Sequence, residues 1–282
     1  TVTDDNGSSG TDQIIVTVTD SIDLNVSANP NPICRNETVL LQANASGGTS
    51  PYSYSWDNGL GTDSVQTDQP LTNTQYTVTA TDINGCQEID SITVAVNDLP
   101  SVIANASPNP ICEDEESILS ATGSDGQAPY SYSWSNGLGM GEFQTVSPSS
   151  SETYSVTITD NNGCTSTDDV FLQVWPKPSV STNANPNPVC IGESTIIEAN
   201  GSVGASPYTY FWDNGIGAVQ TDTVFPTTDT IFNVTVTDSH GCTNEGSLNI
   251  SVYELPSVTT SASPSSICPG DSSTISATGS GG

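Results

Sequence analysis

Seven cysteines are the residues of this 282-residue chain whose chemistry and spacing are most informative. Cysteines at fixed places in a chain are typical of disulfides, which persist in oxidising compartments. Cys-x-x-Cys pairs and Cys/His clusters, the usual signatures of zinc sites, are absent. The cysteines therefore predict disulfides and an extracellular location. They form two series with a constant spacing of 78 residues, namely Cys34, Cys112, Cys190 and Cys268, and Cys86, Cys164 and Cys242.

The single histidine, His240, gives little support for catalysis. It occupies the position held by Asn84 and Asn162 in earlier turns, and histidine tolerates the left-handed backbone of such turns. A Ser-His-Asp hydrolase would have to be built on that turn, and no nucleophile motif accompanies it. Glycosidases use paired carboxylates, but nothing in the sequence places two acidic residues in one cleft. We expect no enzyme, no catalytic residue and no cofactor other than calcium.

Calcium is the one metal that the acidic residues suggest. Hard cations need several oxygen ligands that converge, and contiguous or recurring acidic residues could supply them. No EF-hand loop pattern is present, so a solvated acidic face with aspartates as turn formers is the favoured alternative. The recurring acids of the turns are Asp82, Asp160 and Asp238. The candidate ligands are the contiguous Glu113, Asp114, Glu115 and Glu116.

The net charge of −30, with only two Lys and Arg residues, excludes one class of partner. Nucleic-acid binding needs a basic surface, so nucleic acid is not an expected partner. An acidic surface is also repelled by anionic membranes, and no apolar run approaches the ~20 residues of a membrane helix. We therefore expect no membrane insertion. The expected partners are neighbouring repeats of the same chain and, through regions outside this sequence, other surface proteins or polysaccharide.

Aromatic residues and prolines follow the same 78-residue spacing as the cysteines. Internal repetition at a fixed period indicates tandem structural units. The register predicts whole repeats at 23–100, 101–178 and 179–256, each ending in a short joint that contains proline. Residues 1–22 are predicted to be the C-terminal strands of a truncated repeat, and residues 257–282 the N-terminal strands of another. Proline-containing joints are stiffer than Gly/Ser tethers, so we expect a linear array.

Each repeat has the pattern of about seven short β-strands. β-Branched residues dominate, Asn-Gly turns recur, and Tyr154, Val156 and Ile158 alternate with polar residues as in a half-buried strand. A tryptophan on the third strand and an aromatic residue opening the sixth are typical of an immunoglobulin-like sandwich. The predicted fold class is all-β, a linear tandem array of seven-stranded immunoglobulin-like or PKD-like sandwiches. The predicted core residues are Trp56, Trp134, Trp212, Tyr76, Tyr154 and Phe232.

The pairing of the cysteines follows from this predicted topology. The first cysteine of a repeat would lie in the turn between strands A and B, and the second after the turn between F and G, at the opposite end of the sandwich. That separation is about a strand length, far beyond the ~4.4–6.8 Å between Cα atoms of a disulfide. Pairing between consecutive repeats is therefore favoured, as Cys34–Cys164 and Cys112–Cys242. Pairing within repeats stays open, as Cys34–Cys86, Cys112–Cys164 and Cys190–Cys242.

Three segments carry a resemblance to a known group of proteins: PYSYSWDNGLG (51–61), QYTVTATDINGC (75–86) and NPICEDEES (109–117). With them, the whole chain resembles the PKD-like and immunoglobulin-like repeats of giant cell-surface adhesins of Bacteroidota, including those of gliding motility. The resemblance implies export by the type IX secretion route and display on the cell surface. It also implies O-glycosylation at Ser or Thr between Asp and an aliphatic residue. The candidate positions are Ser21, Ser64, Ser91, Thr223 and Thr230.

Two classes of function remain after this reasoning. The first is the structural shaft of a secreted, surface-displayed adhesin or extracellular filament, a stiff disulfide-linked rod that presents a distal binding region. The alternative is a set of carbohydrate-binding or accessory repeats of a secreted polysaccharide-degrading enzyme. A sugar platform needs exposed aromatic residues on one face. Trp175, next to Pro176, is the only tryptophan outside the core register and is expected to contact the joint, so the shaft is favoured.

Overall fold

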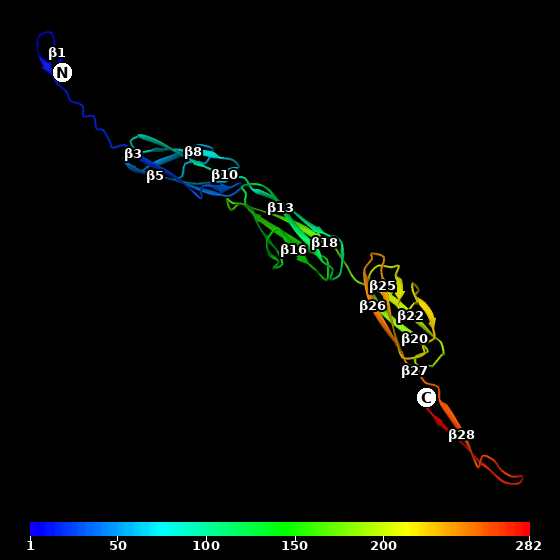
Figure 1. The fold of residues 1–282 in the computed structure, drawn as a ribbon. Coiled ribbons are helices and arrows are strands. Elements are labelled where there is room, and N and C mark those ends of the chain that lie inside the picture. Colours follow the sequence, from blue (N-terminus) through cyan, green and yellow to red (C-terminus); the bar gives the residue numbers. More distant parts are fainter. The chain divides into compact units, whose positions relative to one another are not determined.

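Strands and their connections make up the whole of the computed structural model, which describes Thr1–Gly282 (Figure 1). β-Branched residues favour the pleated backbone, while Asn, Asp and Gly occupy the turns. No helix is long and apolar enough to cross a membrane. The strands of the first complete repeat are β3 (Ile22–Asn29), β4 (Ile33–Cys34), β5 (Val39–Gly47), β6 (Ser53–Trp56), β7 (Val65–Asp68), β8 (Thr74–Thr81), β9 (Gln87–Val94) and β10 (Val96–Asn97).

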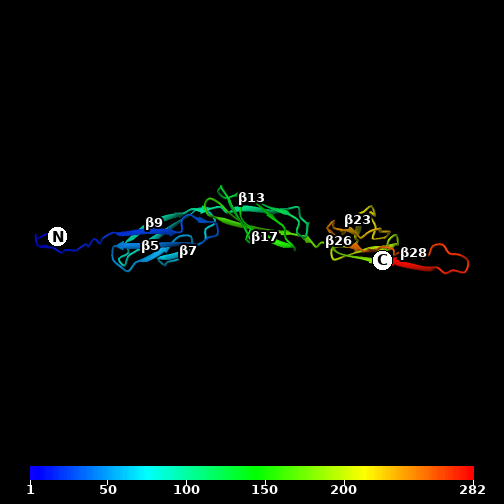
Figure 2. The same ribbon diagram turned by 60° about the horizontal axis from the view of Figure 1, so that its bottom comes forward.

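These strands form two antiparallel sheets that face each other, in the order β3-β5-β7 and β6-β8-β9 (Figure 2). In immunoglobulin nomenclature they are strands A-B-E and C-F-G. The short β4, strand A′, leaves the first sheet and pairs in parallel with β10, the end of strand G. Side chains alternate between buried and exposed along β3, as period-two patterning requires. With A′, this repeat has the seven strands of an immunoglobulin-like sandwich.

The same order recurs in the third repeat, as β20-β22-β24 with β23-β25-β26, and in the middle repeat, as β11-β13-β16 with β14-β17-β18, where the two-residue β15 adds a further strand beside β14. The strands of the middle repeat are β11 (Pro100–Ser107), β12 (Ile111–Cys112), β13 (Ser117–Asp125), β14 (Ser131–Trp134), β15 (Gly139–Met140), β16 (Phe143–Val146), β17 (Glu152–Thr159), β18 (Thr165–Leu172) and β19 (Val174–Trp175). Those of the third are β20 (Ser179–Asn185), β21 (Val189–Cys190), β22 (Thr195–Ser202), β23 (Thr209–Trp212), β24 (Thr221–Val224), β25 (Thr230–Thr237), β26 (Thr243–Ile250) and β27 (Val252–Tyr253).

The ends of the chain form two separate hairpins. Near the N-terminus β1 (Val2–Thr3) pairs with β2 (Ser9–Gly10). Near the C-terminus β28 (Ser257–Ser263) pairs with β29 (Thr274–Ser280), and Ser257 faces Ser280 as Ser179 faces Ser202 in the third repeat. The C-terminal hairpin therefore reproduces strands A and B of a repeat.

The chain divides into two compact units, and the division does not follow the repeat boundaries predicted from the sequence. Unit 1 contains Thr1–Ala104, Ala121–Glu142 and Ser155–Asp169. Unit 2 contains Asn105–Ser120, Phe143–Tyr154 and Val170–Gly282. Each end of the middle repeat is thus grouped with the repeat that it adjoins. Each joint between complete repeats lies inside one unit.

The core of each repeat is built around one indole ring. Trp56, Trp134 and Trp212 are 6%, 4% and 1% exposed, and the aromatic residues that open strand F, Tyr76, Tyr154 and Phe232, are 0%, 3% and 6% exposed. The indole N–H groups of Trp56 and Trp134 donate to the carbonyl oxygens of Asp63 and Gly141 at 2.9 and 3.0 Å, whereas that of Trp212 has no acceptor. Burial of these rings accounts for the alternation seen in the flanking strands.

The structure adds one detail to the predicted connection between strands A and B. Cys112 lies within it on β12, which pairs in parallel with β19 and forms an ordered edge there.

Candidate functional site: the disulfide-linked joints between repeats

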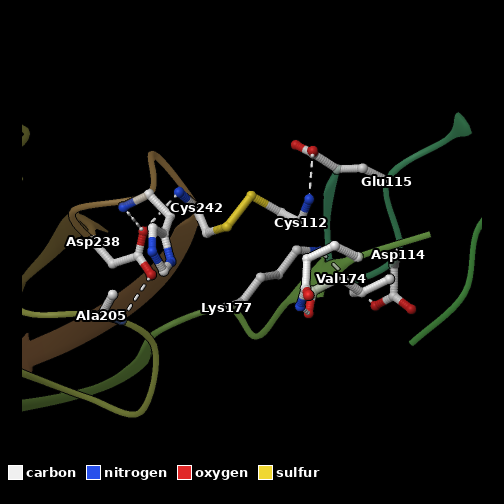
Figure 3. The surroundings of a disulfide bond; sticks show 10 residues. Cys112, Asp114, Glu115, Val174, Lys177, Ala205, Asp238 and Cys242 are labelled. Carbon is white, nitrogen blue, oxygen red and sulfur yellow. Dashed lines mark hydrogen bonds and ion pairs between the residues drawn. A yellow bond between two sulfur atoms is a disulfide. The ribbon is translucent and has the colours of Figure 1, made fainter. Parts of the chain in front are cut away.

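The second joint contains a disulfide between Cys112 and Cys242, whose Cα atoms are 5.6 Å apart (Figure 3). Cys112 lies on β12, and Cys242 lies at the end of the turn between β25 and β26. The two cysteines are 7% and 1% exposed. The bond therefore connects strand A′ of one repeat with the F–G turn of the next, in a site closed to solvent.

The first joint contains the equivalent bond, between Cys34 and Cys164, with the same sequence separation of 130 residues and the same Cα distance of 5.6 Å. The structure does not bring together the cysteines of a single repeat. Cys34 lies opposite Asn97 in the parallel backbone pairing of β4 with β10, at the end of strand G, whereas Cys86 precedes the start of that strand. Roughly ten residues of extended chain separate the two places, which is about 30 Å.

Strand A′ holds the first cysteine of each bond in place. Cys112 lies opposite Trp175 in the parallel pair β12–β19, and its N–H donates to Oε2 of Glu115 at 3.0 Å. The N–H of Cys34 donates to Oε2 of Glu37 in the same way, at 2.8 Å. The glutamate three residues after the cysteine thus satisfies a backbone donor that the short strand leaves unpaired.

A buried aspartate holds the second cysteine. Oδ1 of Asp238 accepts hydrogen bonds from the N–H groups of His240 and Cys242, each at 2.9 Å, and Oδ2 accepts one from Ala205 at 3.0 Å. One carboxylate therefore shapes the F–G turn and attaches it to the B–C loop. Asp82 and Asp160 make the equivalent bonds in the other repeats, and all three aspartates are 5% exposed.

These contacts change the acidity of two of the aspartates. Burial raises the pKa of the Asp238 carboxyl, but the N–H donors of Ala205, Cys242 and His240 outweigh it and hold the pKa below its usual range. The pKa of Asp82 is lowered in the same manner, with burial opposed by the N–H groups of Cys86, Thr49 and Asn84. Both carboxylates are thus stabilised in the charged form.

Ring stacking and ion pairs complete the joints. Trp175 stacks on His240, with ring centroids 4.0 Å apart and an interplanar angle of 14°. Lys177 and Asp114 approach to 3.8 Å in the same joint, and Arg35 pairs with Asp98 at 2.5 Å in the first joint. The only two basic side chains of the sequence therefore both lie at joints. These ion pairs are partly exposed, so each contributes little to stability.

The residues considered for other chemistry do not converge. No group of three or more His, Cys, Asp or Glu side chains is placed to hold a metal ion. Of the four calcium candidates, Glu115 accepts the N–H of Cys112, Asp114 faces Lys177, and Glu116 is exposed to solvent. Glu113 is half-buried, and its N–H donates to the carbonyl oxygen of Trp175.

The candidate glycosylation positions are spread over the repeats. Ser21, Ser91 and Thr223 are exposed, and Ser64 and Thr230 are half-buried. Ser64 also belongs to the sheet edge, since its carbonyl oxygen accepts the N–H of Ala43. Nothing in the structure distinguishes these positions from other exposed Ser and Thr residues.

The sequence predicted the F–G aspartates as turn formers, but it did not predict the role of the acidic residue after the A′ cysteine, although a signal for it was present. An acidic residue follows the A′ cysteine by three positions each time, as Glu37, Glu115, Glu193 and Asp271. An aspartate precedes each F–G cysteine by four positions, as Asp82, Asp160 and Asp238. The constant spacing from the A′ cysteine to the acidic residue after it could have indicated a carboxylate that accepts the cysteine N–H, as Glu37 and Glu115 do, rather than a calcium ligand.

Comparison with known proteins gives one family match. Residues 40–61, which run from strand B through Trp56, match the model of the SprB repeat. No curated protein matches the chain.

Solved structures with similar arrangements include a three-domain immunoglobulin fragment of titin, I67–I69, with 14% identity and a TM-score of 0.42, covering 84% of this chain and 99% of that one. The N-terminal eight immunoglobulin domains of Down syndrome cell adhesion molecule match at 12% identity and a TM-score of 0.40, over 85% of this chain and 38% of that one. A Ca²⁺-stabilized adhesin from an Antarctic bacterium matches at 15% identity and a TM-score of 0.34, over 87% and 77%.

The assignment of the fold depends on the strand order A-B-E and C-F-G with A′ paired to G, which all three complete repeats share. The chain is therefore a tandem array of immunoglobulin-like sandwiches, one segment of which matches the SprB repeat.

Proposed function

We propose that this chain is part of the shaft of a secreted, surface-displayed adhesin or extracellular filament. In this role the repeats extend in a stiff, disulfide-linked rod and present a binding region that lies elsewhere in the protein. The observation that carries the proposal is the repeated covalent bond across the joints, Cys34–Cys164 and Cys112–Cys242. A single-chain connection of two or three residues permits bending, whereas a second, covalent connection at the same joint restricts it.

Three further observations support the proposal. The match of residues 40–61 to the SprB repeat agrees with the resemblance to surface adhesins of Bacteroidota. Disulfides are typical of proteins outside the cytosol. The net charge of −30 keeps neighbouring rods apart in solution and disfavours lateral aggregation.

The carbohydrate-binding alternative has lost its main candidate residue. Trp175 is the tryptophan outside the core register, and it is half-buried in its stack on His240 rather than presented on an open face. A sugar platform needs an aromatic ring with a free face. Binding of chain 1–282 on a glycan array would favour this alternative over the shaft.

Small-angle scattering of chain 1–282 tests the rod. We expect an elongated particle with the disulfides intact, and a broader, shorter distribution of dimensions in the double variant Cys34→Ser/Cys112→Ser. A compact particle, or identical profiles for the two proteins, would contradict the shaft.

Display on the cell surface is tested by a second experiment. Antibodies against residues 23–256 should label intact cells that make the protein, and external protease should remove the label. Labelling only after permeabilisation would refute surface display.

A further inference from the structure

The far end of the third repeat has the same backbone pairing as the two joints, and the cysteine there is exposed. Strand β21 pairs in parallel with β27, so that Cys190 lies opposite Tyr253, as Cys34 lies opposite Asn97 and Cys112 opposite Trp175. Cys190 is a free, exposed thiol, whereas Cys112 at the equivalent position is 7% exposed in its disulfide. The backbone that would receive an F–G turn is therefore already formed.

The side chains around Cys190 are those of an interface rather than of a solvated end. Ile191, Tyr253 and Leu255 are 39%, 58% and 61% exposed. Ile191 is bonded to Tyr253 through its N–H and the tyrosine carbonyl oxygen, at 2.9 Å. In the first two joints the position of Ile191 holds Arg35 and Glu113, and the position of Leu255 holds Leu99 and Lys177. The third end is thus the most apolar of the three.

Tyr253 occupies the place of the joint aromatic. Its counterpart Trp175 is half-buried because it stacks on the F–G residue His240. Tyr253 has no such partner and is exposed. The phenol ring is positioned to pack on the corresponding residue of an incoming F–G turn, as the indole ring does in the second joint.

We propose that Cys190, Ile191, Tyr253 and Leu255 form a docking site for the F–G turn of a further sandwich of this kind, fixed by a disulfide from Cys190. The expected partner is the sandwich whose strands A and B are β28 and β29, because their register repeats that of β20 and β22. Its F–G cysteine would follow Cys190 by the same 130 residues that separate the two bonded pairs. This docking proposal depends only on the geometry of the joint, and it would stand even if the protein were not displayed on a cell surface.

Formation of the bond is an oxidation. The thiols of Cys190 and of the incoming cysteine lose two protons and two electrons as the S–S bond forms. An external disulfide such as oxidised glutathione accepts them and is reduced to two thiols. The expected bond therefore forms in the same oxidising conditions as the two that are present.

The test completes the fourth sandwich with residues from this chain. Residues 257–282 correspond to 179–204, so a copy of residues 205–256 appended after Gly282 supplies the missing strands and a copy of Cys242. After oxidative refolding, we expect Cys190 to change from fully reactive with N-ethylmaleimide in chain 1–282 to less than a tenth reactive in the extended protein. Cys268, which gains no partner, is the internal control and should stay reactive. Peptide mapping should recover Cys190 linked to the copied cysteine.

The matched control carries Cys242→Ser in the appended copy only, and Cys190 should regain its reactivity there. Protection of Cys190 that persists in this control would overturn the disulfide. Near-ultraviolet circular dichroism and resistance of the extension to protease establish that the copy folds. If it does not fold, a copy of residues 127–178, which supplies Cys164, replaces it. Cys190 that reacts as fast as Cys268 in both extended proteins would overturn the proposal.

Discussion

The indole ring of Trp175 stacks on the imidazole ring of His240 at a centroid distance of 4.0 Å, next to the disulfide between Cys112 and Cys242. Trp175 is the backbone partner of Cys112, and His240 lies two residues before Cys242. The ring pair therefore joins residues from the two sides of the joint, one adjacent in the ladder to Cys112 and one near Cys242 in the F–G turn.

Removing this ring pair should expose the second disulfide. An aromatic pair contributes about 0.5–1.5 kcal/mol beyond its area burial, so we expect Trp175→Ala to speed reduction of Cys112–Cys242 by dithiothreitol by about two-fold to ten-fold. The Cys34–Cys164 bond of the same molecule should be unaffected. Asn97→Ala, at the equivalent position of the first joint, is the matched control. Equal rates for the two bonds in Trp175→Ala would contradict a covering role for the ring.

The connectivity predicts three reactive thiols in the unreduced protein, at Cys86, Cys190 and Cys268. Intact mass after alkylation should show three additions without reduction and seven after reduction in denaturant. Trypsin has one effective site in this chain, after Arg35, because Lys177 precedes a proline, so mapping needs a protease that cleaves at aspartate or glutamate. The map should contain Cys34 linked to Cys164 and Cys112 linked to Cys242. A peptide that links Cys34 to Cys86 would refute pairing between repeats.

Gly126 should be less tolerant of substitution than other turn glycines. Its φ is +58°, and a Cβ atom there would lie 2.8 Å from Oδ2 of Asp160 and 3.0 Å from the backbone nitrogen of Pro100. Gly163 has a φ of +83° but open space around it, so Gly163→Ala measures the conformational cost alone. We expect Gly126→Ala to lower the free energy of unfolding by about 1–3 kcal/mol more than Gly163→Ala in urea titrations. Equal losses of unfolding free energy in the two variants would mean that the residues around Gly126 move to accommodate the methyl group.

The F–G aspartates predict a loss of stability in acid. The pKa values of Asp82 and Asp238 are lower in the folded protein than in the unfolded chain. Their contribution is therefore fully present above the unfolded pKa of about 3.9 and is lost as the pH falls through the lower, folded value. Urea unfolding between pH 7 and pH 2 should show stability falling below about pH 4. The double variant Asp82→Asn/Asp238→Asn should be less stable at pH 7 and show a weaker fall. An unchanged pH profile in this variant would contradict the assignment.

Calcium is expected to have no effect on this chain. The carboxylates of Asp82, Asp160 and Asp238 already accept backbone N–H groups, which a cation would have to displace. Titration calorimetry with CaCl₂ should give no binding heat, and a chelator should leave the melting temperature unchanged. A saturable heat with an increase in melting temperature would restore Glu113, Asp114, Glu115 and Glu116 as candidate ligands.

The amino-acid sequence by itself determined the repeating all-β architecture of this protein. Strand type and core side depend on alternation along a few residues, as in Tyr154, Val156 and Ile158, and turns depend on local Asn-Gly pairs. A period of 78 residues then places the tryptophans at equivalent positions without any knowledge of their contacts. These features are local or periodic, so they can be read along the chain.

Contacts between residues far apart in the chain were decided only by the tertiary structure. The sequence left two cysteine pairings open, and the parallel pairing of Ile33 with Val96 is what carries Cys34 away from Cys86. The stack of Trp175 on His240 and the link from Asp238 to the B–C loop likewise depend on which loops meet at a joint. Such meetings are set by the packing of two sheets and of successive repeats, a property that no short stretch of sequence contains.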